Sequence, residues 1–160
     1  VGIVTQKIDE AYNLSGFYSH GKSIRTKSDI SSKDNTLSFE DAEELAWKSI
    51  KGRNKSERVV LGKYEADSPN SYTEVAKEMD AQYFELDNWN QLASEYSLDE
   101  IWKINEKFLD IQSSSGREIF LSHDPELYIG ETSFFSRELH YLIHNGYEFF
   151  KEGGVWRAVR

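Results

Sequence analysis

The stretch REIFLSHDPELYIGETSFFSRELHYLIHNGYEFF, residues 117–150, decides the fold. It opens with a short apolar run over 117–122, which predicts a strand. A polar loop follows, and residues 133–145 then place apolar side chains at helical spacing and end at Gly146. Aromatic residues directly after that glycine predict another strand. A strand, a helix and a second strand in this order are typical of an α/β protein.

The same alternation extends back to residue 58. Strands are expected at 58–64 and 82–86, and helices at 71–79 and 97–112, each helix opening with a Ser followed three residues later by a Glu. The segments YEFF and VWRAV, joined by a Lys-Glu-Gly-Gly turn, predict a C-terminal antiparallel hairpin. We therefore expect an α/β fold with a small, mainly parallel sheet that is flanked by helices and extended by this hairpin.

The N-terminal part of the chain has a different composition. Residues 1–37 are rich in Ser, Lys, Asp and Gly, and we interpret them as an arm or linker. Ser38 then begins a helix, with an acidic residue three positions on. We expect residues 38–160 to form the α/β domain, preceded by the arm.

Composition limits the classes of partner. The formal net charge is −9, and residues 64–160 contain eight Lys and Arg against nineteen Asp and Glu. Such a domain is a poor general binder of nucleic acid, because neutralisation of phosphates supplies most of that affinity. No stretch is long and apolar enough to predict a membrane span. The start has neither a Met nor the pattern of a signal peptide, so we expect a fragment of a longer protein.

Polar side chains follow two of the expected strands and accompany the last long helix. In open α/β sheets, ligands bind beyond the carboxyl ends of the strands. The strand that begins at residue 58, the strand at 117–122 and the helix at 133–145 all bring residues to that edge. The candidate catalytic and substrate-binding residues are Gly62, Lys63, Tyr64, Ser122, His123, Asp124, Phe134 and Glu138.

Glu138 is the leading catalytic candidate. On a helix it lies beside Phe134, four residues before it, and Leu142, four residues after it. Apolar neighbours of this kind raise the pKa of a carboxyl group. The helix pattern alone leaves an alternative open, namely a surface glutamate near the positive end of the helix dipole.

Ser122, His123 and Asp124 have the residue types of a hydrolase triad, but their spacing argues against one. Neighbouring residues on an extended chain point to opposite sides, and triad members usually come from separate segments. We favour a loop that caps the turn before Pro125.

His140 and His144 share a helix face at a spacing that zinc sites use. The Glu that should follow the first His in a zinc-protease motif is absent, since Tyr141 stands there. We interpret the two histidines as part of a polar surface, and we expect neither a metal nor another cofactor.

The segment GETSFFSRELHYLIHNGYEF, residues 130–149, combines a Gly/Thr turn, an early helical Glu, an apolar face and a Gly before a strand. It resembles the Gly-Thr…Glu…Gly pattern of nucleoside deoxyribosyltransferases and of the related NAD-cleaving α/β domains. In this chain Glu131 stands between Gly130 and Thr132. The resemblance implies that Glu138 attacks or steadies a ribosyl cation as an N-glycosidic bond breaks, by the chemistry of glycoside cleavage.

Residues 59 to about 150 resemble a toxin module found at the C-termini of bacterial polymorphic toxins of the Rhs, LXG and contact-dependent inhibition types. The matching segments are VVLGKY, SYTEVAKEMDAQYFEL, IWKINEKFLD, REIFLS and SRELHYLIHNGYEF. This chain departs from the pattern with an extra stretch at 65–70 and a longer loop at 123–132. The resemblance implies an effector that is secreted as part of a larger protein and acts in the cytoplasm of a target bacterium. It also implies a cognate immunity protein, and it leaves the need for a host-cell activator open.

Our leading functional hypothesis is a toxin hydrolase that cleaves the N-glycosidic bond of a nucleotide, with NAD as the first candidate. Glu138 would stabilise the ribosyl cation. Ser122 and Asp124 would hold the ribose hydroxyls, and Lys63 would hold a phosphate. Tyr64 or Phe134 would stack on the base.

Two other hypotheses stay open. The first is a toxin ribonuclease that cleaves tRNA or rRNA, with His123 as general acid or base and with Lys63 and Arg117 near the phosphate. The second is a non-catalytic acidic binding module or an immunity protein, because small acidic domains can mask basic toxins.

Overall fold

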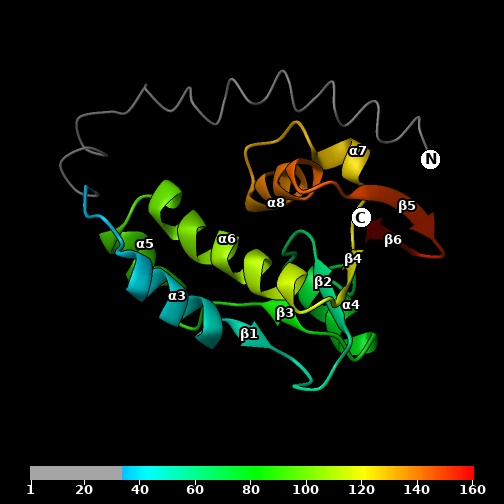
Figure 1. Cartoon of the computed structure of the whole chain (residues 1–160), viewed down its shortest axis with the longest axis horizontal. Coiled ribbons are helices and arrows are strands. Elements are labelled where there is room, and N and C mark those ends of the chain that lie inside the picture. Colours follow the sequence, from blue (N-terminus) through cyan, green and yellow to red (C-terminus); the bar gives the residue numbers. More distant parts are fainter. Residues whose placement is uncertain (1–33) are drawn as a thin grey trace.

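The computed structural model describes residues 34–160, and Figure 1 shows the arrangement of their helices and strands, with the C-terminal hairpin at the right-hand side. The helices are α3 (Phe39–Lys48), α4 (Tyr72–Glu78), α5 (Trp89–Glu95), α6 (Leu98–Ser114), α7 (Pro125–Tyr128) and α8 (Phe134–His144). The strands are β1 (Ile50–Lys51), β2 (Arg58–Leu61), β3 (Tyr83–Phe84), β4 (Glu118–Leu121), β5 (Glu148–Glu152) and β6 (Val155–Val159).

The sheet is mixed, with parallel pairing at its centre. Strands β2 and β4 pair in parallel, β4 pairs antiparallel with β6, and β6 pairs antiparallel with β5. On the other side of β2, Val59 and Gln82 form a parallel bridge that brings β3 alongside. Strand β1 then pairs antiparallel with β3. The carboxyl ends of β2, β3 and β4 therefore share one edge of the sheet, as the alternating sequence pattern predicts.

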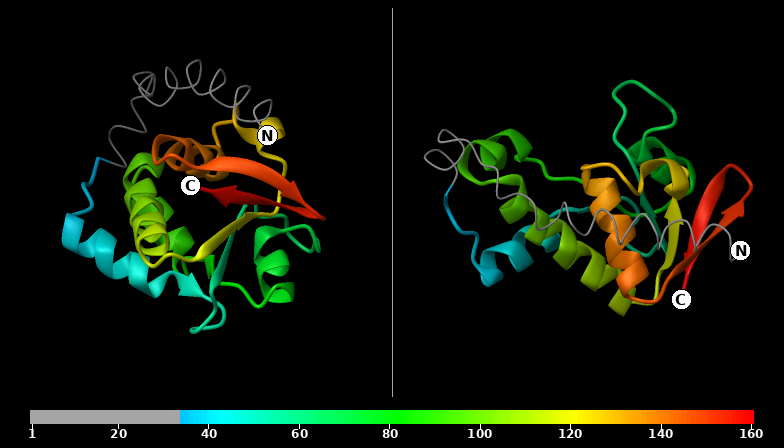
Figure 2. Two further views of the ribbon diagram at one scale, coloured as in Figure 1. Left: turned by 45° about the vertical axis from the view of Figure 1, so that its right-hand side comes forward. Right: turned by 90° about the horizontal axis from the view of Figure 1, so that it is seen from above.

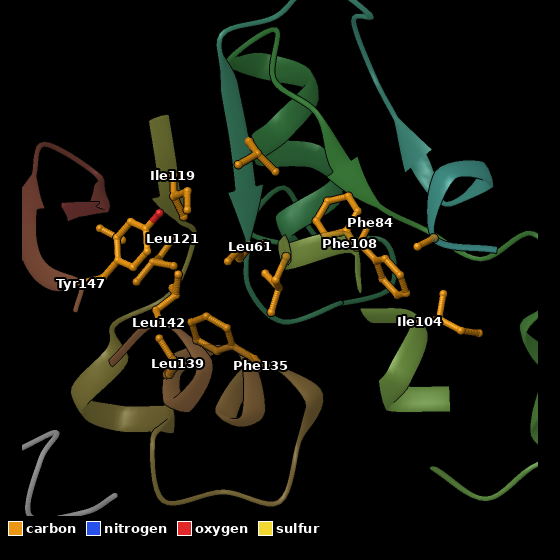
Figure 3. Close-up of a cluster of buried hydrophobic side chains, with 14 of the residues drawn as sticks. Leu61, Phe84, Ile104, Phe108, Ile119, Leu121, Phe135, Leu139, Leu142 and Tyr147 are labelled. Atoms are coloured by element: carbon orange, nitrogen blue, oxygen red, sulfur yellow. The ribbon is translucent and has the colours of Figure 1, made fainter. Parts of the chain in front are cut away.

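Helices cover both faces of this sheet, as the two further views show (Figure 2). Alternate residues of a strand face opposite sides. Leu61 and Leu121 face the main core with α3, α6 and α8, whereas Val60 and Phe120 face a smaller cluster with α4. Figure 3 shows the centre of the main core, where side chains from α8 and the strands converge. Phe135, Leu139 and Leu142 are among its most deeply buried residues.

Serine side chains cap three of the helices. Ser38, Ser97 and Ser133 each accept a hydrogen bond from the backbone N–H three residues ahead, at the starts of α3, α6 and α8. The expected cap at Ser71 is wrong, because this side chain makes no capping bond to α4. Its Oγ instead accepts a hydrogen bond from the backbone N–H of Glu65 at 3.1 Å, and so it holds the loop that follows β2.

The expected α/β architecture is confirmed, including the parallel pair, the flanking helices and the C-terminal hairpin. The sheet is mixed and not mainly parallel, because β6 pairs antiparallel with both β4 and β5. The structure adds two short helices that the sequence analysis did not predict, α5 and α7, and the short strand β1. Most of the expected arm lies outside the described residues. Its last residue, Leu37, is buried in the main core. None of the helices between residues 34 and 160 combines the length and apolar character of a membrane-spanning helix.

Candidate active site

The carboxyl ends of β2 and β4 approach each other so closely that only glycine fits on one side. A Cβ atom added to Gly62 would lie 1.8 Å from the Oγ of Ser122 and 3.0 Å from the Cβ of Tyr72. The backbone N–H of Ser122 also donates to the carbonyl of Leu61 at 2.9 Å, which continues the parallel pairing to this point. Gly62 is thus required so that the Ser122 side chain can lie between the two strand ends.

A chain of hydrogen bonds runs from Ser122 through His123 to Glu65. The Oγ of Ser122 lies 2.7 Å from Nδ1 of His123, and Nε2 of the same ring lies 3.0 Å from a carboxylate oxygen of Glu65. The backbone N–H of Lys63 donates to Nδ1 at 3.3 Å. Because that N–H can only donate, Nδ1 accepts, and Nε2 of the neutral ring carries the proton toward Glu65. The hydrogen bond from His123 lowers the pKa of the Glu65 carboxyl.

The His123 ring is held on all sides. It is buried, and its ring centroid lies 5.4 Å from that of Tyr128 and 6.1 Å from that of Phe135, both in edge-on arrangements. Such contacts fix the orientation of the ring. A histidine with a fixed tautomer beside a carboxylate has the parts of a general acid or base.

Lys63 extends over the loop that follows β4. Its Nζ lies 2.9 Å from Oε2 of Glu131 and 5.0 Å from the centre of the Tyr128 ring. The backbone of Lys63 is fixed at both ends, since its N–H bonds to His123 and its carbonyl accepts from the N–H of Tyr72 at 3.0 Å. The backbone bonds therefore hold Lys63 at the carboxyl edge of the sheet.

Glu138 is buried in the interior and does not lie on the helix surface. Its side chain is 5% exposed, and Asn105 Nδ2 donates to its Oε2 at 3.0 Å. Burial raises the pKa of the Glu138 carboxyl to about 8, against a smaller opposing effect of the Asn105 hydrogen bond. The alternative of a solvated surface glutamate is thereby excluded. At neutral pH this carboxyl group is mainly protonated in the free protein.

An aromatic cluster lies along the same helices. The ring of Phe134 stands edge-on to the rings of Trp89 and Trp102, with centroid distances of 5.7 Å in both cases. Because Trp102 lies three residues before Asn105, and Phe134 four before Glu138, the aromatic pair and the polar pair occupy neighbouring positions along α6 and α8. We call Trp89, Trp102 and Phe134 the aromatic cluster.

Tyr72 packs beside the strand ends. Its Cβ lies beside Gly62, and its hydroxyl donates to the carbonyl of Phe84 at the end of β3. Burial raises the pKa of the Tyr72 hydroxyl, and the negative charges of Glu138 and Glu85 raise it further.

The remaining candidates have less specific positions. Asp124 is the N-cap of α7, where its Oδ1 accepts the backbone N–H of Glu126 at 3.0 Å, as expected of a loop that caps the turn before Pro125. The side chain of Tyr64 is 68% exposed. Arg117 precedes β4 and bonds to the carbonyl of Ser56, so it lies at the amino edge of the sheet. The expectation that it shares a phosphate site with Lys63 is wrong.

His140 and His144 do not form a metal site with other side chains that the structure describes, where no group of three potential ligands is found. The ring of His140 is half-buried, and its Nε2 lies 3.1 Å from the carbonyl oxygen of Ile129. A separate groove of about 820 Å³ lies at the amino edge of the sheet, between α3 and α6, and it is lined in part by Gln82 and Arg117. It is distinct from the residues around Glu138.

Four important residues escaped the sequence analysis as site residues. Asn105 had a visible signal, because it interrupts the apolar stripe of its helix and thus indicates a buried polar partner. Glu65, Glu131 and Trp89 lie in or beside loops, and no spacing rule connects them with their partners.

Comparisons of the chain with protein-family models, with curated proteins and with solved structures gave no significant match.

Proposed function

We propose that this domain hydrolyses the N-glycosidic bond of a small nucleotide, with NAD as the first candidate substrate. The observation that carries the proposal is the buried, hydrogen-bonded carboxyl of Glu138. Gly62, Lys63 and Ser122 follow the carboxyl ends of β2 and β4, and this is the edge at which open α/β sheets bind their ligands. The net charge of −9 favours a small soluble substrate over a long polyanion.

The protonation of Glu138 suits a reaction in which positive charge appears on the substrate. In the free protein, burial keeps the carboxyl group mainly neutral. The oxocarbenium-like centre that forms at the ribose as the bond breaks favours the ionised carboxylate. The attraction is then strongest in the transition state, and only such an interaction speeds the chemical step.

Neighbouring groups provide binding functions for the rest of a nucleotide. The aromatic cluster offers ring faces and edges for a planar base, with Trp89 38% exposed. Ser122 lies at the strand ends, where its hydroxyl can bind a ribose hydroxyl. Lys63 supplies a point charge for a phosphate. Asp124 has a smaller role in this arrangement, because one of its carboxylate oxygens caps α7.

The decisive experiment is incubation of the purified chain with NAD and measurement of nicotinamide release by chromatography. We expect release by the native chain and its loss in Glu138→Gln, which keeps the shape and the hydrogen-bond acceptor for Asn105. Asn145→Gln, on an exposed residue after α8, is a matched control and should keep the activity. Intact NAD after long incubation with a folded protein would reject the proposal.

Ribonuclease activity is a second candidate, and the hydrogen-bond chain Ser122–His123–Glu65 favours it. A histidine with a fixed tautomer could move a proton during phosphodiester cleavage, beside the ammonium group of Lys63. Discrete cuts in tRNA or rRNA after expression would support this candidate. It also predicts that His123→Ala abolishes toxicity whereas Glu138→Gln does not.

The proposed biological role is that of an antibacterial toxin effector with a cognate immunity protein, delivered from a larger secreted protein into the cytoplasm of a target cell. Its support is the resemblance of residues 59 to about 150 to polymorphic-toxin modules. Induced expression of residues 34–160 in bacteria should stop growth, and Glu138→Gln should restore it. Unharmed cells that are instead protected from a partner toxin would identify a binding module or an immunity protein.

A further inference from the structure

The ammonium group of Lys63 is paired with a carboxylate of the same chain. The partner is Glu131, whose carboxylate lies 2.9 Å from Nζ, and the side chains of the two residues are 31% and 37% exposed. In the free protein, a negative side chain of the chain itself therefore occupies the position beside this ammonium group.

From these contacts we infer that Glu131 occupies a phosphate subsite at Lys63, and that the substrate is a phosphorylated nucleotide whose phosphate displaces this carboxylate. The inference rests on the proposed function and specifies its substrate class. The loop between α7 and α8, which carries Glu131, would thereby help to select the ligand.

The exchange is physically favourable for three reasons. A phosphate monoester such as that of AMP carries about −1.5 to −2 charges at neutral pH, and the two phosphates of NAD together carry about −2, against −1 for a carboxylate, so either attracts the ammonium group more strongly. The partly exposed carboxylate of Glu131 regains water when it leaves, which makes its release inexpensive. The backbone of Lys63 stays fixed by its bonds to His123 and Tyr72, so the ammonium group need not be repositioned.

Other cations at this edge are less suited to the task. Arg137 lies over the rings of Trp102 and Phe134 and donates to Asp99 at 2.9 Å. Its guanidinium is thus held by two rings and a carboxylate whose side chain is 21% exposed. Lys63 has the simpler and more exposed pairing, and it directly follows the close strand contact at Gly62.

The test is calorimetric titration of the full chain with AMP and with adenosine, which differ only in the phosphate. We expect AMP to bind about tenfold more tightly, as a charge-assisted hydrogen bond allows. In Lys63→Met the two affinities should become equal. In Glu131→Gln the affinity for AMP should rise about two- to fivefold, the gain expected when an exposed ion pair no longer competes, with adenosine unchanged.

Glu44→Gln is the matched control, because it breaks the ion pair with Lys48 at 3.0 Å on α3. It should leave both affinities unchanged. Equal binding of AMP and adenosine by the native chain, no binding of either, or no effect of Glu131→Gln on AMP would overturn the inference.

Nicotinamide release separates this inference from the proposed function. If AMP binds as expected and NAD stays intact, the phosphate subsite is supported and the proposed glycosidic reaction is rejected. If the native chain, Lys63→Met and Glu131→Gln all cleave NAD equally, the reaction is supported and the phosphate subsite is rejected.

Discussion

Asn105 and Glu138 join α6 to α8 through a buried hydrogen bond of 3.0 Å. Arg137–Asp99 and Tyr141–Asp110 also join these two helices, but at half-buried positions, whereas Asn105 and Glu138 are both buried. An amide donor satisfies one carboxyl oxygen without bringing a charge of its own. The pair therefore keeps Glu138 in place while burial favours its protonated form.

The Glu138→Gln variant should be more stable than the native chain, by a margin that grows as pH rises. With the pKa of Glu138 raised to about 8, the folded state keeps a proton that the unfolded chain releases above its ordinary pKa of 4.5. The native chain therefore loses stability between these two values, on the order of a few kcal/mol in total, whereas the Gln variant is spared this loss. Urea unfolding from pH 4 to pH 8 measures the difference, which should be smallest at pH 4. A constant difference across this range would show that Glu138 does not titrate as proposed.

Under the proposed reaction, kcat/KM for nicotinamide release should rise with pH. This quantity reports the ionisation of the free enzyme. Since the ionised carboxylate is the active form and its pKa is about 8, the rate constant should increase about tenfold per pH unit below that value and level off above it. A flat profile between pH 5 and pH 7 would contradict this role for Glu138.

Gly62→Ala should destabilise the fold through one specific contact. The new Cβ would lie 1.8 Å from the Oγ of Ser122, and relief of this overlap costs about 1–3 kcal/mol. In a Ser122→Ala background the same change should cost measurably less, because the overlapping oxygen is gone. Gly154→Ala is the control, since no atom lies within 4 Å of its added Cβ. Chemical denaturation of the four variants would reveal whether the two costs are coupled, and simple additivity would argue against the contact.

His123 should be found as the tautomer with its proton on Nε2. The backbone N–H of Lys63 donates to Nδ1, which leaves Nε2 to donate to Glu65. Nitrogen NMR shifts of the labelled ring distinguish the two tautomers. Glu65→Gln keeps an acceptor and should preserve the pattern, whereas Glu65→Ala should allow the ring to exchange between states. A proton on Nδ1 in the native chain would require a different hydrogen-bond chain.

Trp89→Ala should weaken binding of a nucleotide about fivefold with little effect on the fold, because stacking on one ring contributes about 1 kcal/mol or more and Trp89 is 38% exposed. Titration with AMP, followed by tryptophan fluorescence, measures the change. Trp47→Ala removes a 57% exposed tryptophan of α3 and should leave the affinity unchanged. Equal losses in both variants would indicate that the aromatic cluster is not the base site.

The sequence predicts the fold well because its signals are local. Serine caps, glycine stops and alternating apolar runs mark most helices and strands in the described part of the chain. The two short helices were missed because α7 spans only four residues, and because α5, with seven, lacks the Ser and Glu three residues apart that mark the start of the equally short α4. Similarly, the error at Ser71 arises because a loop competes for its hydroxyl, and no rule of spacing includes that loop.

The candidate site was less predictable because its pairs join distant segments. The partner of His123 is 58 residues away, and that of Lys63 is 68 residues away. The position of Glu138 followed from the helix pattern, but its burial depends on how α6 packs against α8. Arg117 shows the opposite case, since it stands at the start of β4 and therefore at the wrong edge for the expected role.

The central place of β6 has a consequence for how the protein is made. This strand, Val155–Val159, lies between β4 and β5, so the sheet lacks an internal member until these residues have left the ribosome. A nascent chain that stops at residue 154 would expose the edge of β4 and leave β5 unpaired. The complete sheet therefore forms only after β6 has been translated. A short deletion in β6 should destabilise the domain more than the loss of an outer strand.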